Sequence, residues 1–216
     1  MIKISPSIIC ANYLNLQKEI DDIAINFNVS SIHVDIMDGI FVNQITIGEK
    51  FVETIQKYSN LPLDIHLMTI NPINQIEKYI KMNVNSIIFH YEAINETNDI
   101  LKMEKIQYIN YIIKKSGIKC GIAIDYNTDI INVLQYIKYC DIILVMTVKA
   151  GFAGQKFELN AINKIKILQN FLKEQNINKL IYIDGGINDN IIENIQNQSL
   201  SVDTFIMGSA FFKNKN

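Results

Sequence analysis

The sequence predicts an α/β fold, a (β/α)8 TIM barrel, in which eight parallel strands form a ring inside a layer of helices. Apolar runs typical of strands alternate with helical stretches along all 216 residues. The runs are almost continuously apolar, as in 142–146, which is typical of parallel strands buried on both faces. All three histidines, His33, His66 and His90, fall at the expected carboxyl ends of strands, the edge where such barrels carry their chemistry.

The expected elements follow one another in strand–helix order without a linker, so one domain spanning residues 1–216 is expected. Strands are expected to begin near Ile2, Ser31, Pro62, Ser86, Lys119, Asp141, Leu180 and Asp203. Helices are expected at Tyr13–Phe27, Gly48–Tyr58, Ile73–Met82, Asp99–Lys115, Ile130–Ile137, Asn160–Gln175 and Asn190–Gln196. A doubly wound open sheet is the alternative, but no G-x-G-x-x-G follows the first strand.

The last helix is expected to be truncated, because only residues 208–216 follow the eighth strand. These residues suffice for one helical turn, so part of the outer surface of the barrel is expected to be bare or covered by a partner subunit.

Composition restricts the class of protein. The chain is 49% hydrophobic and 19% charged, which is typical of a globular domain, and its net charge of −2 gives no basic footprint for nucleic acid or an acidic membrane. No apolar run approaches the roughly 18 residues of a membrane span, and the N-terminus lacks a signal-peptide pattern. Three widely spaced cysteines argue against a disulfide framework. A cytoplasmic protein without nucleic-acid or membrane partners is expected.

Two strands carry a repeated polar pattern. Alternation along a strand places His33, Asp35 and Met37 on one face, and the run 63–68 repeats the pattern with His66 and Met68. The seventh strand ends in Asp184. Two imidazoles and two carboxylates are a sound ligand set for Zn²⁺ or another first-row divalent metal. A surface aspartate beside a hydrogen-bonded core histidine is the alternative interpretation of the first pair.

The same residues suit proton abstraction next to a carbonyl. One carboxylate would remove the proton from one face of a bound sugar, and the other would return a proton to the opposite face. A metal would meanwhile hold the enediolate oxygens. Met37, Met68 and Met146 fall at similar heights on their strands and would give a dry lining, although methionine is usually plain core filler.

Glycine-containing loops follow the last three strands and predict a phosphate site. Gly185-Gly186 follows the seventh strand and Gly208-Ser209 the eighth, where these barrels often bind phosphate. After the sixth strand the run Gly151-Phe152-Ala153-Gly154 suits a phosphate clasp or a lid. Ordinary tight turns are the alternative.

Taken together, these segments resemble the ribulose-phosphate 3-epimerase family in nearly the whole chain. The matching runs are 5–8, 33–39, 46–48, 62–68, 89–90, 145–148, 151–157, 184–186 and 208–209. The resemblance implies a barrel of the ribulose-phosphate-binding type that acts on a phosphorylated ketose, inverts C3 of D-ribulose 5-phosphate to give D-xylulose 5-phosphate in the pentose phosphate pathway, and forms a homo-oligomer.

The resemblance also assigns roles to residues. It implies that Asp35 and Asp184 are the acid/base pair, and that one divalent metal, Zn²⁺ first with Fe²⁺, Mn²⁺ or Co²⁺ as alternatives, is held by His33, Asp35, His66 and Asp184. Ser7 would touch the sugar. The expected substrate site comprises Ser7, Met37, His66, Met68, Met146, Gly151, Phe152, Ala153, Gly154, Asp184, Gly185, Gly186, Gly208 and Ser209.

Departures from the family pattern leave alternatives open. The run 40–44 reads Ile-Phe-Val-Asn-Gln where the family usually has His-Phe-Val-Pro-Asn, and Ala150-Gly151 stands where Pro-Gly is usual. Cys10 and the run 151–154 resemble the relatives that act on D-allulose 6-phosphate. A non-catalytic phosphosugar-binding barrel is a further alternative, whereas a phosphosugar decarboxylase is disfavoured because the run 33–38 contains no lysine.

Overall fold

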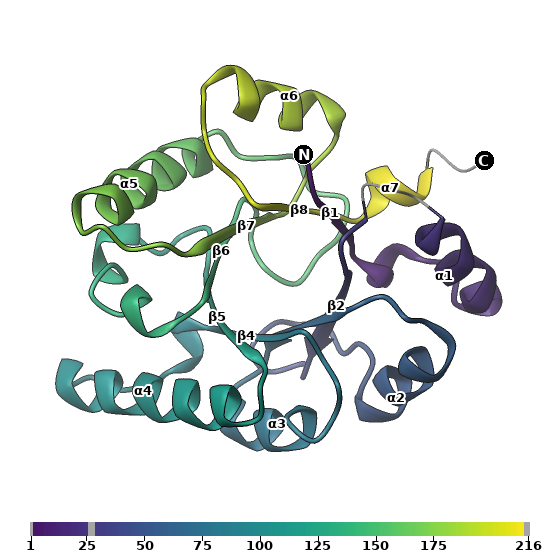
Figure 1. Ribbon diagram of the computed structural model, residues 1–216, viewed down its shortest axis with the longest axis horizontal. Coiled ribbons are helices and arrows are strands. Elements are labelled where there is room, and N and C mark those ends of the chain that lie inside the picture. Colours follow the sequence, from purple (N-terminus) through teal and green to yellow (C-terminus); the bar gives the residue numbers. More distant parts are fainter. Residues whose placement is uncertain (1, 26–28, 214–216) are drawn as a thin grey trace.

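The computed structural model describes residues 2–25 and 29–213, and within them eight parallel strands form one sheet (Figure 1). The strands are β1 Ile4–Pro6, β2 Ile32–Met37, β3 Leu63–Met68, β4 Ser86–His90, β5 Lys119–Ile124, β6 Ile142–Met146, β7 Leu180–Asp184 and β8 Thr204–Met207. The sheet runs from β1 through β8 and down to β2. Parallel bridges from Ile4 to Val29 and from Ser7 to His33 join its two ends. The predicted barrel is confirmed, and the open sheet is excluded.

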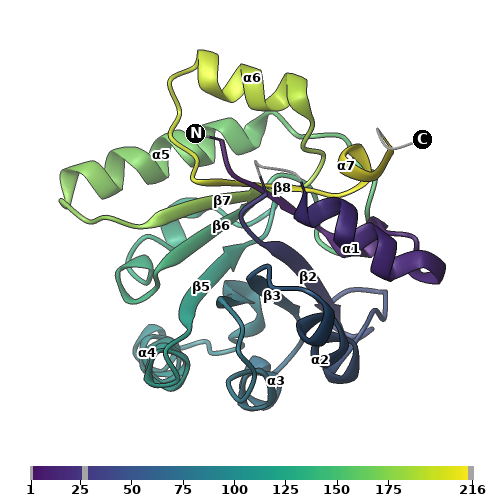
Figure 2. The ribbon, with the colours of Figure 1, turned by 45° about the vertical axis from the view of Figure 1, so that its right-hand side comes forward.

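Helices surround the ring of strands (Figure 2). They are α1 Leu16–Ala24, α2 Glu49–Tyr58, α3 Pro72–Tyr79, α4 Asp99–Lys115, α5 Asn160–Glu174, α6 Asp189–Asn197 and α7 Ser209–Lys213, together with 3₁₀ turns at Ile8–Cys10, Tyr13–Asn15, Tyr91–Ala93, Ile130–Asn132 and Ile137–Tyr139. The helix expected at 13–27 begins as a 3₁₀ turn, and its last two residues lie outside the described residues. α7 is short, as predicted.

The helix expected at Ile130–Ile137 is wrong, because this segment forms two 3₁₀ turns instead. Successive backbone N–H groups bond three residues back, from Val133 to Ile130 and from Tyr136 to Val133. Ile130, Val133 and Tyr136 are all buried, so the apolar side chains recur every three residues, which matches the 3₁₀ period. β-branched residues also lose rotamer freedom in an α-helix, which favours the tighter turns here.

The barrel has two apolar layers on the two faces of its sheet. Ile32, Val34 and Ile36 of β2 belong to the large layer shared with the helices. A smaller layer fills the inside of the ring and includes Met37, Met68, Ile88, Ala123, Leu144, Met146, Tyr182 and Ile206. The inside is tightly packed, since a Cβ on Gly121 would lie 2.7 Å from Ile88 Cγ1. Any polar side chain that points inward must therefore find partners in the ring.

Among the described residues, no helix combines the length and the apolar character needed to cross a membrane.

Candidate active site

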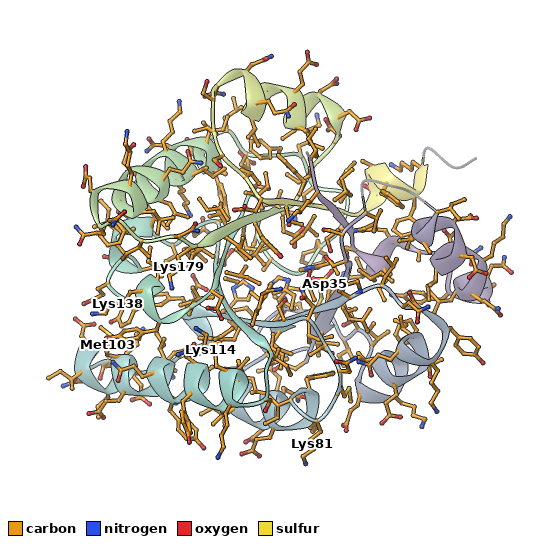
Figure 3. The ribbon with its side chains drawn as sticks, viewed as in Figure 1. Asp35, Lys81, Met103, Lys114, Lys138 and Lys179 are labelled. Atoms are coloured by element: carbon orange, nitrogen blue, oxygen red, sulfur yellow. The ribbon has the colours of Figure 1, made fainter. Side chains whose placement is uncertain are left out.

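The polar side chains of β2 and β3 lie inside the barrel. His33 and His66 are fully buried and Asp35 is 5% exposed. His33 is the second residue of β2 and His66 the fourth of β3, so among the three histidines only His90 ends its strand. The expectation that all three lie at strand ends is thus wrong, and the site lies deeper than the rim. Figure 3 shows Asp35 within the ring, whereas Lys81 and Lys138 lie outside it.

Strand register brings the predicted metal ligands together. Asp35 is the register partner of His66 on the neighbouring strand, and Asp184 ends β7. His66 Nδ1 lies 2.9 Å from Asp35 Oδ1, 3.2 Å from His33 Nε2 and 3.9 Å from Asp184 Oδ2. His33 Nε2 lies 3.3 Å from Asp35 Oδ1 and 3.9 Å from Asp184 Oδ2.

These distances fit a divalent cation. One donor atom from each of the four residues lies within 4.8 Å of the other three. Ligand atoms about 2.0–2.1 Å from a tetrahedral metal are about 3.3 Å apart, which is close to the separations found here. Unprotonated imidazole nitrogens and carboxylate oxygens carry the lone pairs that a cation accepts. The four residues therefore form a cluster that can bind a metal ion.

Opposite charges on Asp35 and His33 stabilise each other in this cluster. Burial opposes ionisation of Asp35, but attraction to His33 and hydrogen bonds with His33 and His66 hold the pKa of Asp35 far below its usual range. Burial alone would lower the pKa of His33, but the same attraction to Asp35 raises the pKa of His33 to about 9. Without a metal, a proton on His33 thus supplies the positive charge next to Asp35.

The pKa values of Asp184 and His66 shift in the opposite directions to those of Asp35 and His33. Burial, with repulsion from Asp35, raises the pKa of Asp184 to about 7. Burial also lowers the pKa of His66 to about 4, with repulsion from His90 adding to it and the hydrogen bond to Asp35 opposing it. The two environments thus shift the pKa values of Asp35 and Asp184 in opposite directions, as in active sites that need one base and one acid.

A pocket of about 150 Å³ opens above this cluster. Asp35 and Asp184 lie at its wall, together with Ser7, whose hydroxyl donates to Asp35 Oδ2 over 2.5 Å. The predicted substrate residues that line it are Ser7, Met37, Met68, Met146, Gly151, Phe152, Ala153, Gly154, Asp184, Gly185, Gly186, Gly208 and Ser209. His66 does not line the pocket, because it is buried beneath the surface that the pocket exposes.

Sequence reasoning missed other residues of the pocket. Its wall also contains Ile9, Cys10, Val148, Lys149, Ala150, Gln155, Ile187, Asn188, Ile206 and Ala210. Most of these lie within two positions of a predicted residue in the chain, so extending each motif by two positions was the signal that could have found them.

The loops around the pocket depend on glycine. Gly185 and Gly186 have φ of 117° and 63°, and Gly154 has φ of 78°, a region that favours glycine. A Cβ on Gly186 would overlap the backbone nitrogen of Phe157, whereas a Cβ on Gly154 would meet nothing within 4 Å. Gly186 thus lets the loop after β7 pack directly on the loop after β6.

The matched replacements Gly186→Ala and Gly154→Ala should therefore differ in cost. Both pay about 1–2 kcal/mol for a positive φ, but only Gly186→Ala also pushes the two loops apart. We expect a larger loss of unfolding free energy and a larger rise in KM for Gly186→Ala, measured by urea denaturation and steady-state kinetics. Equal losses in the two variants would contradict the packing role of Gly186.

The run 40–44, which departs from the family pattern, is firmly attached. Asp38 Oδ1 accepts the backbone N–H groups of Ile40 and Phe41, each over 2.8 Å. The Phe41 ring lies 4.8 Å from the His90 ring, centroid to centroid. Val42 is buried against Gly151, where an added Cβ would come within 2.8 Å of it. The altered run thus connects the loop after β2 with the loop after β6.

Comparison with known proteins agrees with this geometry. Residues 3–212 match the model of the ribulose-phosphate 3 epimerase family. Ribulose-phosphate 3-epimerase of Buchnera aphidicola is 33% identical over 216 residues, covering 99% of this chain and 90% of that protein. The protein of the same name from Bacillus subtilis is 34% identical over 189 residues, covering 87% of this chain and 82% of the relative.

Solved structures support the fold. A tryptophan synthase α-subunit from Pyrococcus furiosus has a TM-score of 0.64 at 11% identity and covers 98% of this chain and 88% of its own. An aldolase from Escherichia coli K12 has a TM-score of 0.63 at 15% identity, and the match covers 98% of this chain and 77% of the aldolase. Because the family match spans nearly the whole chain and the buried His/Asp cluster lies beside the pocket inside the barrel, this chain is an enzyme of the ribulose-phosphate 3-epimerase family.

Proposed function

We propose that this enzyme inverts C3 of D-ribulose 5-phosphate, giving D-xylulose 5-phosphate, by proton transfer between the sugar and two carboxyl groups. The observation that carries the proposal is the convergence of Asp35 and Asp184, with His33 and His66, beside the pocket. C3 is next to the C2 carbonyl of the ketose, so loss of its proton gives an enediolate whose charge is delocalised over oxygen.

Asp35 and Asp184 would act on the two opposite faces of C3, as inversion requires. They come from β2 and β7, which are separated in the ring by β1 and β8. One carboxyl group takes the C3 proton from one face, and the other delivers a proton to the opposite face. Ser7 donates a hydrogen bond to Oδ2 of Asp35, and Oδ1 faces His66 and His33, so both oxygens of this carboxyl group have fixed neighbours. Met37, Met68 and Met146 exclude water above the carboxyl groups and strengthen the local electrostatics.

The cation site belongs to the same proposal. His33 Nε2, His66 Nδ1, Asp35 and Asp184 would hold one divalent ion, with Zn²⁺ as the first candidate and Fe²⁺, Mn²⁺ or Co²⁺ as alternatives. When bound, the ion supplies Lewis-acid stabilisation of negative charge on the sugar oxygens. The loops with Gly154, Gly185, Gly186, Gly208 and Ser209 would receive the phosphate at the other end of the pocket.

A paired assay tests the substrate. We expect kcat/KM for D-ribulose 5-phosphate to exceed that for D-allulose 6-phosphate by about 10-fold or more, because a pocket shaped for the pentose must make room for one more CHOH unit in the sugar chain. Coupled assays on metal-loaded protein would measure both values, with Asp184→Asn as the background. A preference for the hexose phosphate would contradict the proposed substrate but would leave the proposed proton-transfer mechanism in place. Turnover of neither would favour a binding barrel.

A further inference from the structure

His90 lies behind the metal cluster, with both ring nitrogens engaged. It ends β4 and is fully buried. Its Nε2 lies 2.9 Å from His66 Nε2, and its Nδ1 lies 3.1 Å from Glu92 Oε2. His90 therefore connects a candidate metal ligand to a carboxylate that is outside the cluster.

Glu92 is itself fixed by two further donors. Its other oxygen, Oε1, accepts the backbone N–H of Asp125 over 2.9 Å and the hydroxyl of Thr128 over 2.5 Å. Oε2 is then left to face His90. An ionised carboxylate can only accept, so the nitrogen of His90 that faces it must carry a proton.

The carboxylate of Glu92 determines where the protons lie along the hydrogen-bonded series Glu92–His90–His66. With its proton on Nδ1, neutral His90 presents a lone pair at Nε2, so His66 must donate from its own Nε2. The two rings are inclined by only 24° and their centroids lie 5.0 Å apart, which lets one nitrogen point at the other nearly in the ring plane. His66 then has its lone pair on Nδ1, the atom that faces His33, Asp35 and Asp184.

We propose that His90 and Glu92 are a positioning pair that holds His66 in the tautomer able to bind the metal. The inference rests on the metal-dependent function proposed above and deepens it. Metal-bound histidines usually donate their second nitrogen to a carboxylate or carbonyl group, which fixes the ring and raises its basicity. Here the acceptor is a second histidine, and the carboxylate lies one residue further away.

His33 has no equivalent support. Its Nδ1 is buried and makes no hydrogen bond within residues 2–25 and 29–213. The other histidine of the cluster is therefore oriented by its place on β2 and by the cluster residues that face its Nε2, which are Asp35, His66 and Asp184. Loss of the positioning pair should therefore change the tautomer of His66 and leave the protonation of His33 as it was.

Nitrogen NMR on histidine-labelled protein tests the tautomers directly. The chain contains three histidines, so the spectrum has six ring nitrogens, and protonated and unprotonated nitrogens resonate in separate ranges. In the Zn²⁺-loaded enzyme we expect His90 to be protonated on Nδ1 alone and His66 on Nε2 alone. His90→Phe assigns the His90 signals by their loss. A His90 protonated on Nε2 would overturn the proposal without any mutation.

Glu92→Gln tests the role of the carboxylate, with Glu96→Gln as the matched control. A glutamine has one acceptor oxygen and cannot receive all three donors of Glu92, whereas the Glu96 carboxylate pairs with Lys105, away from His90. We expect Zn²⁺ affinity, measured by chelator competition, to fall about 10-fold to 100-fold in Glu92→Gln, with a matching fall in activity. Glu96→Gln should stay within about twofold of the wild type. Wild-type affinity in Glu92→Gln would overturn the proposal.

A second pair of variants separates hydrogen bonding from packing. His90→Gln can still accept from His66 and donate to Glu92, whereas His90→Phe keeps a ring but neither contact. We expect His90→Gln to bind Zn²⁺ more tightly than His90→Phe does, and equal affinities would reduce His90 to a packing role. A wild type that binds no metal or does not turn over D-ribulose 5-phosphate would instead contradict the proposed function.

Discussion

We expect replacement of Asp184 by asparagine to lower kcat for epimerisation by about 10²–10⁴-fold, the usual contribution of a positioned acid or base. The amide keeps the shape of the side chain at the end of β7 but cannot exchange a proton with C3. Asp35→Asn should cost at least as much, because Asp35 also accepts the hydrogen bond of the Ser7 hydroxyl and belongs to the cluster that can bind a metal ion. Steady-state kinetics in both directions would measure the losses.

The control for this prediction is Asp189→Asn. Asp189 begins α6, just after the same loop, and is exposed. Its replacement should leave kcat unchanged within about twofold, because an exposed first-turn carboxylate contributes only about 0.3–1 kcal/mol to the helix. Near-normal turnover in Asp35→Asn or Asp184→Asn, with unfolding curves like that of the wild type, would rule out the transfer of protons by two carboxyl groups.

Removal of the metal is expected to have the second large effect. Lewis-acid stabilisation contributes several kcal/mol, so chelation should lower activity by at least about 100-fold, and added Zn²⁺ should restore it. Elemental analysis before and after dialysis gives the metal content, and reconstitution with Fe²⁺, Mn²⁺ or Co²⁺ ranks the alternatives. His66→Ala should need much more metal for the same activity, since it removes one ligand from the buried cluster. Full activity in protein shown to be metal-free would contradict the metal-dependent mechanism.

The strands, and the shared face of the candidate site residues on β2, could be predicted from the sequence for physical reasons. Apolar runs with a helical stretch between them leave few alternatives to a parallel barrel, and the period of two along a strand predicts that His33, Asp35 and Met37 share a face. That face is the inner one. The glycines of the last loops line the pocket, and their binding of phosphate stays a prediction.

Depth in the barrel could not be predicted in the same way. Period-two alternation tells which face a residue occupies but not its height, which depends on register between strands. The contact of Asp35 with His66 follows from the pairing of β2 with β3, and this pairing is not encoded in either segment alone. The same limit applies to His90, whose partners Glu92 and His66 come from a turn and a neighbouring strand.

The most direct test of the account is to run the epimerisation of D-ribulose 5-phosphate in D₂O and locate the deuterium by NMR. If Asp35 and Asp184 act on opposite faces, the proton returned to C3 comes from a carboxyl group that exchanges with solvent. We expect D-xylulose 5-phosphate carrying deuterium at C3 in nearly every molecule formed. Product that keeps the original C3 hydrogen would mean that the hydrogen removed from one face is itself delivered to the opposite face without exchange, and would contradict the mechanism.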